Sequence, residues 1–247
     1  MKLNSYHAEI LNLIKKHAGT PTQHTFSDSY LGNTHFRYSI NVPTLRKIGK
    51  EWMRAHRDLS AQEIAKLLTS LITSESATEK TMAGIMLDNT TLSQRKFDPN
   101  LFDLWLDHLV GWAEIDSVCT GVYTTTEIWA DWVRWQKLLK DFSTSKNINK
   151  RRASIVLLVA PLRRCDDPAM INLALKNIDR LKSEKDVLIT KAISWVLRSA
   201  IPAQTEVIKK YLNLNKASLP KIAVRETLTK LRTGKKTKSK PAKPKKS

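Results

Sequence analysis

Glycine and cysteine are scarce in this chain of 247 residues, and each shortage excludes a class of protein. Its seven glycines fall well below the usual share of about 7%. Neither GxGxxG nor GxxxxGK followed by Ser or Thr occurs, so glycine-rich loops for dinucleotides or nucleoside triphosphates are excluded. The two cysteines, Cys119 and Cys165, form no CxxC pair and accompany no histidine cluster, which argues against a disulfide framework and a structural zinc site. We expect two ordinary buried thiols, no cofactor and no metal.

Long apolar runs are also missing. No stretch approaches the roughly 18 apolar residues that suggest a membrane-spanning helix. Residues Met1–Ser5 lack the apolar stretch and the small-residue cleavage site of a secretory signal. Because 41% of the residues are nevertheless hydrophobic, the chain can build a core. The sequence predicts a soluble intracellular protein that makes no membrane contact.

Acidic residues are few relative to basic ones. There are 23 Asp and Glu against 42 Lys and Arg, which gives a formal net charge of +19. Seven of the lysines lie in residues 233–247, a segment without acidic or large apolar residues, and without them the charge falls to +12. We expect a single folded domain over 1–232 and a disordered Lys-rich tail over 233–247. The excess charge on the folded part indicates a polyanionic partner, with nucleic acid favoured over an anionic membrane.

The hydrophobic period is helical almost throughout, and no convincing alternating strand is visible. Ser60 and Glu63 form a capping box ahead of an amphipathic run from Ile64 to Ile72. The same period recurs over 171–181 and 188–197. Further helices are predicted over 5–17, 44–56, 77–88, 100–110, 126–141, 149–160, 204–213 and 219–231, with breaks at Pro43, Pro99, Pro161, Pro168, Pro202 and Pro220.

About a dozen helices with short joints fit either a compact bundle or stacked helical pairs of the HEAT or armadillo kind. Strict sequence repetition is not visible, so this interpretation depends on the rhythm of the helices. A stack of helix pairs has a concave face, and a basic concave face suits a nucleic-acid duplex. We therefore expect an all-α, HEAT-like helical-repeat solenoid with a basic concave face.

Three segments contain residues that a plain helical core does not require. In 111–117 (GWAEIDS), the i, i+4 spacing places Trp112 and Asp116 on one helix face, so that an indole and a carboxylate are presented together. In 149–156 (NKRRASIV), a basic pair opens an apolar helix. The third segment, 191–198 (KAISWVLR), carries a tryptophan off its apolar stripe.

Each of these residues also has a purely structural explanation. Trp112 and Trp195 could be packing residues, since tryptophan is seldom fully buried. Asp116 could cap a helix or simply pair with Arg151 or Arg152. Arg152 could be one more solvated charge. Taken one at a time, none of them supports an activity.

Taken together and in this order, the segments resemble the DNA alkylation repair family, the HEAT-like-repeat DNA glycosylases. The family pattern has a Trp and an Asp four residues apart, an Arg about 35 residues later before an Ala-Ala/Ser-Ile run, and a second Trp in a KAIxWVLR-like helix. These positions read Trp112, Asp116, Arg152 and Trp195. Residues 35–46 also resemble a family signature, except that Ser39 replaces its usual Gly. The resemblance covers roughly residues 5–231.

The resemblance implies a monofunctional glycosylase that hydrolyses the N-glycosidic bond of cationic alkylated purines in double-stranded DNA. Asp116 would stabilise positive charge on the deoxyribose and orient water, and Trp112 and Trp195 would attract the cationic nucleoside. Arg152 would clamp a backbone phosphate, with Arg151 in reserve. The family is thought to grip the backbone around the lesion, without a pocket that encloses an extruded base.

Weaker expectations concern further phosphate contacts and the state of the protein. We expect contacts from Tyr30, Arg46, Lys191 and Arg198. We also expect a monomer that initiates base excision repair in the cytoplasm, associated with the nucleoid. Residues Trp129, Trp132 and Trp135 are predicted to form one packed helix face.

Two other functions fit the same residues. One is a non-catalytic scaffold of the same architecture that binds distorted or branched DNA. The other is a HEAT-like adaptor that binds an acidic protein. Retention of all four motif residues favours catalysis over the scaffold, and a steep salt dependence of DNA binding would exclude the adaptor.

Overall fold

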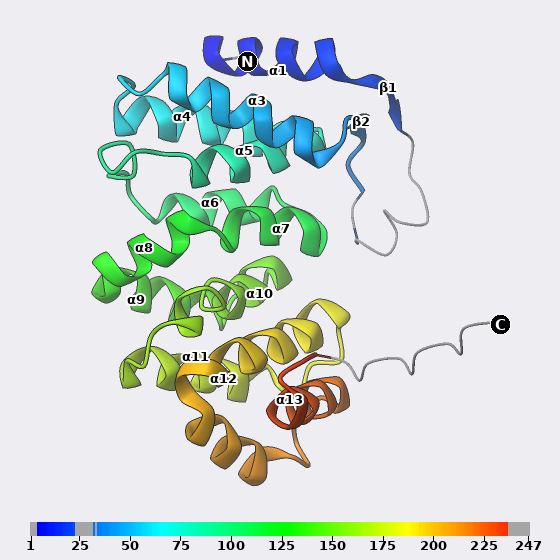
Figure 1. Cartoon of the computed structure of the whole chain (residues 1–247), viewed down its shortest axis with the longest axis vertical. Helices are drawn as coiled ribbons and strands as arrows, with labels where there is room; N and C mark the ends of the chain where they lie inside the picture. Colours follow the sequence, from blue (N-terminus) through cyan, green and yellow to red (C-terminus); the bar gives the residue numbers. More distant parts are fainter. Residues whose placement is uncertain (1–3, 23–31, 33, 237–247) are drawn as a thin grey trace, which may run out of the picture.

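The computed structural model describes residues 4–22, 32 and 34–236, and helices dominate this part of the chain. The helices are α1 (Ser5–His17), α3 (Val42–Ala55), α4 (Ala61–Ile72), α5 (Ala77–Asp88), α6 (Leu101–Asp107), α7 (Gly111–Cys119), α8 (Val122–Ala130), α9 (Trp132–Phe142), α10 (Ile148–Val156), α11 (Pro168–Leu181), α12 (Val187–Asn215) and α13 (Lys221–Thr233), with a 3-10 turn η1 (Pro161–Arg163). Figure 1 shows them stacked in layers along the long axis from the N-terminus to the C-terminus.

The stack contains a continuous row of contacting helices. Each helix of this row packs on the next, in the order α3, α5, α7, α10, α12 and α13. A second set lies against it, in which α4 contacts α1 and α6, and α9 contacts α11. One buried apolar cluster extends through both sets, from Ile10 to Ala223. The predicted all-α helical-repeat fold is therefore confirmed.

Several predicted helix starts are present as the sequence indicates. The Ser60 hydroxyl accepts from the Glu63 N–H, and the Glu63 carboxylate accepts from the Ser60 N–H at 2.9 Å, which completes the capping box of α4. Pro43 and Pro168 lie in the first turns of α3 and α11, where a missing N–H costs no helical hydrogen bond. Proline therefore marks these starts because of its backbone chemistry.

The break predicted at Pro202 is present as a kink: α12 contains Pro202 and leaves helical geometry at Gln204 (φ −134°, ψ 37°), where two helical segments meet. Another predicted boundary is wrong. The single helix predicted over 126–141 is two helices, α8 and α9, separated at Asp131. The three tryptophans therefore do not share one packed face: Trp135 is buried, whereas Trp129 is 43% exposed.

A short antiparallel pair of strands, which the sequence analysis does not predict, lies beside this stack. β1 (Gly19–Thr22) pairs with β2 (Arg37–Ser39), with Gly19 opposite Ser39. Ser39, the departure from the family signature, lies in this extended strand, and no described residue other than glycine has a positive φ. A glycine is not needed there. Cys119 is buried as expected, but Cys165 is only partly buried.

Two glycines set the position of α7. Gly111 begins the helix with φ +73°, a conformation that side-chain-bearing residues rarely adopt. Gly84 on α5 faces α7 so closely that a Cβ there would overlap the carbonyl oxygen of Ser117. Because α5 and α7 can approach this closely, the segment that begins with Trp112 is held firmly in the row.

Candidate active site

A pocket of about 600 Å³ opens where α7, α10, α12 and α13 meet. It gathers a carboxylate, two indoles and several cations from segments that are far apart in the sequence. The lining residues are Trp112, Asp116, Arg152, Val187, Leu188, Lys191, Trp195, Arg198, Ile222, Glu226 and Lys236. Six of the nine residues expected to catalyse or to bind DNA therefore lie around one cavity.

An ion pair between Asp116 and Arg152 forms one wall of this pocket. Arg152 Nη2 donates to both carboxylate oxygens of Asp116, at 2.9 Å to Oδ1 and 2.7 Å to Oδ2, and Nε donates to Oδ1 at 3.0 Å. Its Nη1 donates to the carbonyl of Leu188 at the start of α12. The Arg152 side chain is 4% exposed and that of Asp116 is 14% exposed. The guanidinium therefore fixes the carboxylate and joins α7, α10 and α12.

The electrostatics of Asp116 reflect two opposing influences. Burial raises the pKa of Asp116 above its ordinary value, and the positive charge and hydrogen bonds of Arg152 oppose that rise. Burial also raises the pKa of the neighbouring Cys119 thiol, and the Asp116 charge adds to the effect. Cys119 is thus held as a neutral thiol beneath the site, with no thiolate to act as a nucleophile.

The two expected indoles lie around the same cavity. Trp112, in the first turn of α7, shares the pocket lining with Asp116, as their i, i+4 spacing suggests. Trp195 comes from α12 and packs partly against the apolar core. Both side chains are half-buried, so each has a face against the protein and a face toward the cavity.

The remaining expected contacts are placed differently. Lys191 and Arg198 line the pocket. Arg151 points elsewhere, because its guanidinium forms a double hydrogen-bonded pair with Glu184, at 2.8 Å from Nε and 3.0 Å from Nη2. Arg46 is exposed on α3, near enough to Asp88 to influence its pKa. Tyr30 lies outside the described residues.

Glu226 is a second carboxylate in the pocket, and sequence reasoning missed it. It lies on α13, is 12% exposed, and accepts from the Ser194 hydroxyl at 2.6 Å. A signal was available, because Glu226 stands three residues after the buried Ala223 and one before the buried Thr227, on the inner side of the helix. An acid at such a position needs a partner or a function.

The start of the Lys-rich segment also contributes to the pocket. α13 extends to Thr233, and Gly234 (φ +69°) ends it in the left-handed conformation. The chain then turns so that Lys236 lines the pocket and pairs with Glu226 at 3.7 Å. Most of the predicted tail, residues 237–247, lies outside the described residues.

Neither metal ligands nor membrane spans are found within the part of the chain that the structure describes. No three His, Cys, Asp or Glu side chains there cluster closely enough to hold a metal ion. No described helix combines the length and apolar character needed to cross a bilayer.

The fold and the pocket together define a class: an all-α helical-repeat protein with an arginine-held carboxylate between tryptophans. The model of the family described as DNA alkylation repair enzyme matches residues 14–231, and the chain belongs to that family. A solved structure described as a "Predicted DNA alkylation repair enzyme from Enterococcus faecalis" shares the fold, with a TM-score of 0.68 and 14% identity over 84% of this chain and 93% of that one. No curated protein matches the sequence.

Proposed function

We propose that this protein is a monofunctional DNA glycosylase that removes cationic alkylated purines, such as 3-methyladenine and 7-methylguanine, from double-stranded DNA and so initiates base excision repair. The observation that carries the proposal is the Asp116 carboxylate, held by Arg152 in a cavity that two indoles also line. Family membership supplies the link to alkylated DNA.

The substrate chemistry suits a site of this kind. A purine alkylated at N3 or N7 carries a positive charge, so its glycosidic bond is already weakened and the base leaves without a strong general acid. Positive charge then develops on the deoxyribose, as in glycoside hydrolysis. A carboxylate fixed beside the sugar stabilises that charge, and the low polarity of a partly buried site strengthens the interaction. Asp116 is placed for this role.

Hydrolysis of the glycosidic bond needs only water as a co-reactant. The bond between C1′ and the purine nitrogen breaks, and its electron pair leaves with the base, which becomes neutral. A water oxygen bonds to C1′, and the proton it loses passes to a carboxylate or to solvent. Oδ2 of Asp116 accepts one hydrogen bond from Arg152, whereas Oδ1 accepts two, so Oδ2 keeps more capacity to orient that water.

Arg152 takes a different role from the phosphate clamp that the sequence suggested. Its Nε and Nη2 face Asp116 and its Nη1 faces Leu188, so the guanidinium is engaged within the protein. We assign it as a positioning residue, which fixes the orientation of the carboxylate. Lys191 and Arg198 also line the pocket, and we assign the contacts with backbone phosphates to them.

The indoles of Trp112 and Trp195 would favour the cationic nucleoside through cation–π attraction of about 0.5–2 kcal/mol each. We expect the row of helices to present a basic, concave side along which the DNA lies, bound by one protein molecule at the nucleoid. The cavity is lined by residues that would meet sugar and phosphate as well as base, which fits recognition of the backbone around the lesion.

The test is release of free 7-methylguanine from alkylated duplex DNA by the wild-type protein and by Asp116→Asn. We expect the wild type to release the base and Asp116→Asn to be slower by about 100-fold or more, the usual scale for losing an electrostatic stabiliser of a transition state. Asp141→Asn is a matched control, because Asp141 pairs with Lys137 on the exposed side of α9. Equal release by wild type and Asp116→Asn would remove Asp116 from the mechanism. No release by either would favour a DNA-binding scaffold.

A further inference from the structure

The Glu226 carboxylate is held by the protein as a bound anion would be. Its Oε2 accepts from the Ser194 hydroxyl at 2.6 Å and lies 3.4 Å from Arg198 Nε, and its Oε1 lies 3.7 Å from Lys236 Nζ. Arg198 Nε also donates to Ser194 Oγ at 3.3 Å, so the donors support one another. These three donors come from two turns of α12 and from the segment after α13, and they converge on one carboxylate.

Positive charge exceeds negative charge around this carboxylate. Burial lowers the pKa of Arg198, the Glu226 charge opposes this, and the nearby charge of Arg163 adds to the lowering. The pKa of Lys230 is lowered by burial and by the charges of Arg198 and Arg163. Arg198 and Lys236 thus pair with Glu226, and Arg163 and Lys230 lie close enough to Arg198 for their charges to interact, whereas Asp116, the other acid of the pocket, is already paired with Arg152. A further anion would be stabilised here.

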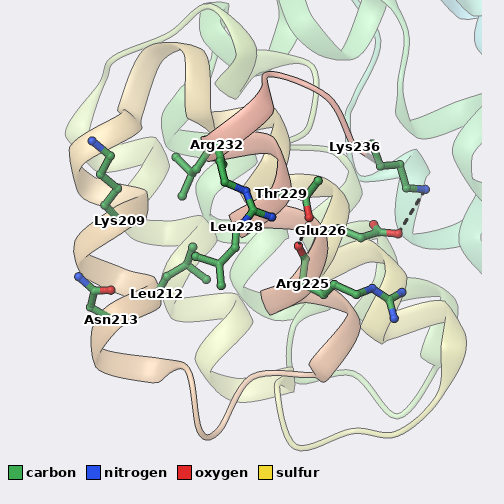
Figure 2. Close-up of a pocket in the computed structure, with 10 residues that line it drawn as sticks. Lys209, Leu212, Asn213, Arg225, Glu226, Leu228, Thr229, Arg232 and Lys236 are labelled. Carbon is green, nitrogen blue, oxygen red and sulfur yellow. Dashed lines mark hydrogen bonds and ion pairs between the residues drawn. The ribbon is translucent and has the colours of Figure 1, made fainter. Parts of the chain in front are cut away.

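The Glu226–Lys236 pair lies between two hollows of the surface. Glu226 and Lys236 line both the 600 Å³ pocket and a neighbouring groove of about 890 Å³ between α12 and α13. Figure 2 shows this groove, with the Lys236–Glu226 pair on one side of α13 and the side chains of Arg225 and Arg232 nearby. Neither arginine forms an ion pair with an acid within the described part of the chain. An anion bound at the Glu226–Lys236 wall would therefore lie directly beside the pocket.

We propose that Arg198 and Lys236, with Ser194, form a binding site for a DNA backbone phosphate next to the lesion, and that Glu226 occupies this site as an internal counter-anion until DNA arrives. The proposal rests on the proposed function for the identity of the ligand. A carboxylate and a phosphate use the same donors, so the two compete. DNA binding must displace Glu226 from Lys236 and Arg198, and this weakens binding to any duplex.

Because Glu226 competes with DNA for Arg198 and Lys236, removal of the Glu226 charge should strengthen DNA binding. The experiment measures the affinity for an undamaged duplex by fluorescence anisotropy over a range of salt concentrations. We expect Glu226→Gln to tighten binding by roughly threefold to tenfold at low salt. We expect its salt slope to steepen by about 0.9 for each additional phosphate that the protein neutralises.

Lys236→Gln should weaken binding and reduce the salt slope by about 0.9, because the protein then neutralises one phosphate fewer. Lys236 is exposed, so this variant should fold normally and keeps the test valid even if Glu226→Gln is unstable. Glu184→Gln and Lys137→Gln are matched controls. Glu184 pairs with Arg151 outside the pocket, and Lys137 pairs with Asp141 on α9. Glu184→Gln should therefore not tighten DNA binding as Glu226→Gln does, and Lys137→Gln should not reduce the salt slope as Lys236→Gln does. The proposal is overturned if Glu226→Gln folds but fails to tighten binding, or if Lys236→Gln keeps the wild-type slope.

This test is separate from the excision assay. If the Glu226 and Lys236 variants behave as expected but the wild type releases no alkylated base, the glycosylase proposal fails and the phosphate site stands. If Asp116→Asn abolishes release while both variants bind undamaged duplex as the wild type does, the phosphate site fails alone.

Discussion

Asp116 and Arg152 are 36 residues apart in the sequence and meet through three hydrogen bonds at the pocket wall. Their pairing was one of the structural explanations that the sequence allowed for Asp116. The pair is compatible with catalysis, because it fixes a carboxylate at a cavity without burying it completely. The ion pair and the proposed catalytic role of Asp116 are therefore compatible.

The pH dependence of excision should report on this pair. In the proposed mechanism Asp116 acts as a carboxylate, so activity should fall as the pH drops through its pKa. Because burial raises that pKa, the acid limb of kcat/KM should lie above the ordinary carboxyl value of about 3.9. Arg152 lowers the pKa, so Arg152→Gln should move the limb to higher pH as well as slow excision. Arg151→Gln, whose guanidinium pairs with Glu184, should leave the limb in place. A limb unmoved in Arg152→Gln would contradict the assignment of Arg152 as the positioning residue of Asp116.

The indoles make a second prediction about single residues. Trp195→Leu keeps an apolar side chain in α12 but removes the π-face, so excision of 7-methylguanine should slow by about 2- to 30-fold, the rate equivalent of one cation–π interaction. Trp129→Leu is the control, because Trp129 is exposed on α8 and lines no part of the pocket. The measurement compares the single-turnover excision rates of Trp195→Leu and Trp129→Leu at saturating protein. Equal rates for the two variants would show that Trp195 only packs.

The sequence predicted some of these residues and not others, for physical reasons. Trp112 and Asp116 belong to one short motif whose i, i+4 spacing places them on one face of α7, and Trp195 belongs to a second motif on α12. The direction of the Arg152 side chain depends on how α10 packs against α7, which the motif does not encode. Glu226 joins the pocket only because α13 folds back onto α12, so no local pattern indicates its partners.

At the scale of elements, α1 is tied to the stack by a buried polar group. His7 on α1 lies 2.7 Å from Ser70 Oγ on α4 and 2.7 Å from Glu79 Oε1 on α5. The three lie beside a hollow of about 1,090 Å³, in the order of a serine, histidine and acid triad. Ser70 is in the interior of α4, where its backbone N–H is used by the helix and cannot stabilise an oxyanion. The cluster therefore acts as an anchor between helices.

This anchor predicts a loss of stability. His7→Leu would leave the buried Glu79 carboxylate without its hydrogen-bond partner, which typically costs about 1–3 kcal/mol. For a domain of this size, that loss lowers Tm by roughly 3–10 °C. His17→Gln, at the exposed end of the same helix, should leave Tm unchanged. Thermal unfolding followed by circular dichroism measures both variants, and a wild-type Tm for His7→Leu would show that the anchor contributes nothing.

Element boundaries were predicted where capping chemistry decides them and missed where packing does. The capping box of α4 and the prolines of α3 and α11 act within one helical turn. The kink of α12 at Gln204 comes two residues after Pro202, where the sequence predicts a break. The break at Asp131 follows no such rule, because helical periodicity runs across it. The strands β1 and β2 are too short to show alternation.

At the scale of the whole molecule, the formal charge of +19 divides between a folded part and a Lys-rich segment. The sequence predicts a tail over 233–247 that lies outside the folded domain. Lys236 belongs to this segment by composition but lines the pocket. Lys236 therefore contributes to the pocket as well as to the charge of the segment.

Two truncations separate these contributions. Removal of residues 237–247 deletes five lysines and should weaken duplex binding most at low salt, with little effect on single-turnover excision at saturating protein. Removal of residues 234–247 also deletes Lys235 and Lys236, and should lower the affinity and the salt slope further. Anisotropy titrations at two salt concentrations compare the two truncations directly. Identical affinities and slopes for both would contradict a role for Lys236.

The all-α architecture could be predicted from the sequence, because helical periodicity and short joints leave few alternatives to stacked helices. Which helices form the row that carries the site could not be predicted. Residues from α7, α10, α12 and α13 share one cavity only because these helices are successive neighbours in the stack.

The most direct test of the proposed mechanism compares excision of 7-methylguanine and of uracil from otherwise identical duplexes by the wild-type protein under single-turnover conditions. If Asp116 stabilises charge on the sugar and the lesion supplies its own activation, 7-methylguanine is released and uracil, a neutral base, is released poorly or not at all. Efficient excision of uracil would contradict this mechanism, because the pocket would then have to activate a neutral leaving group.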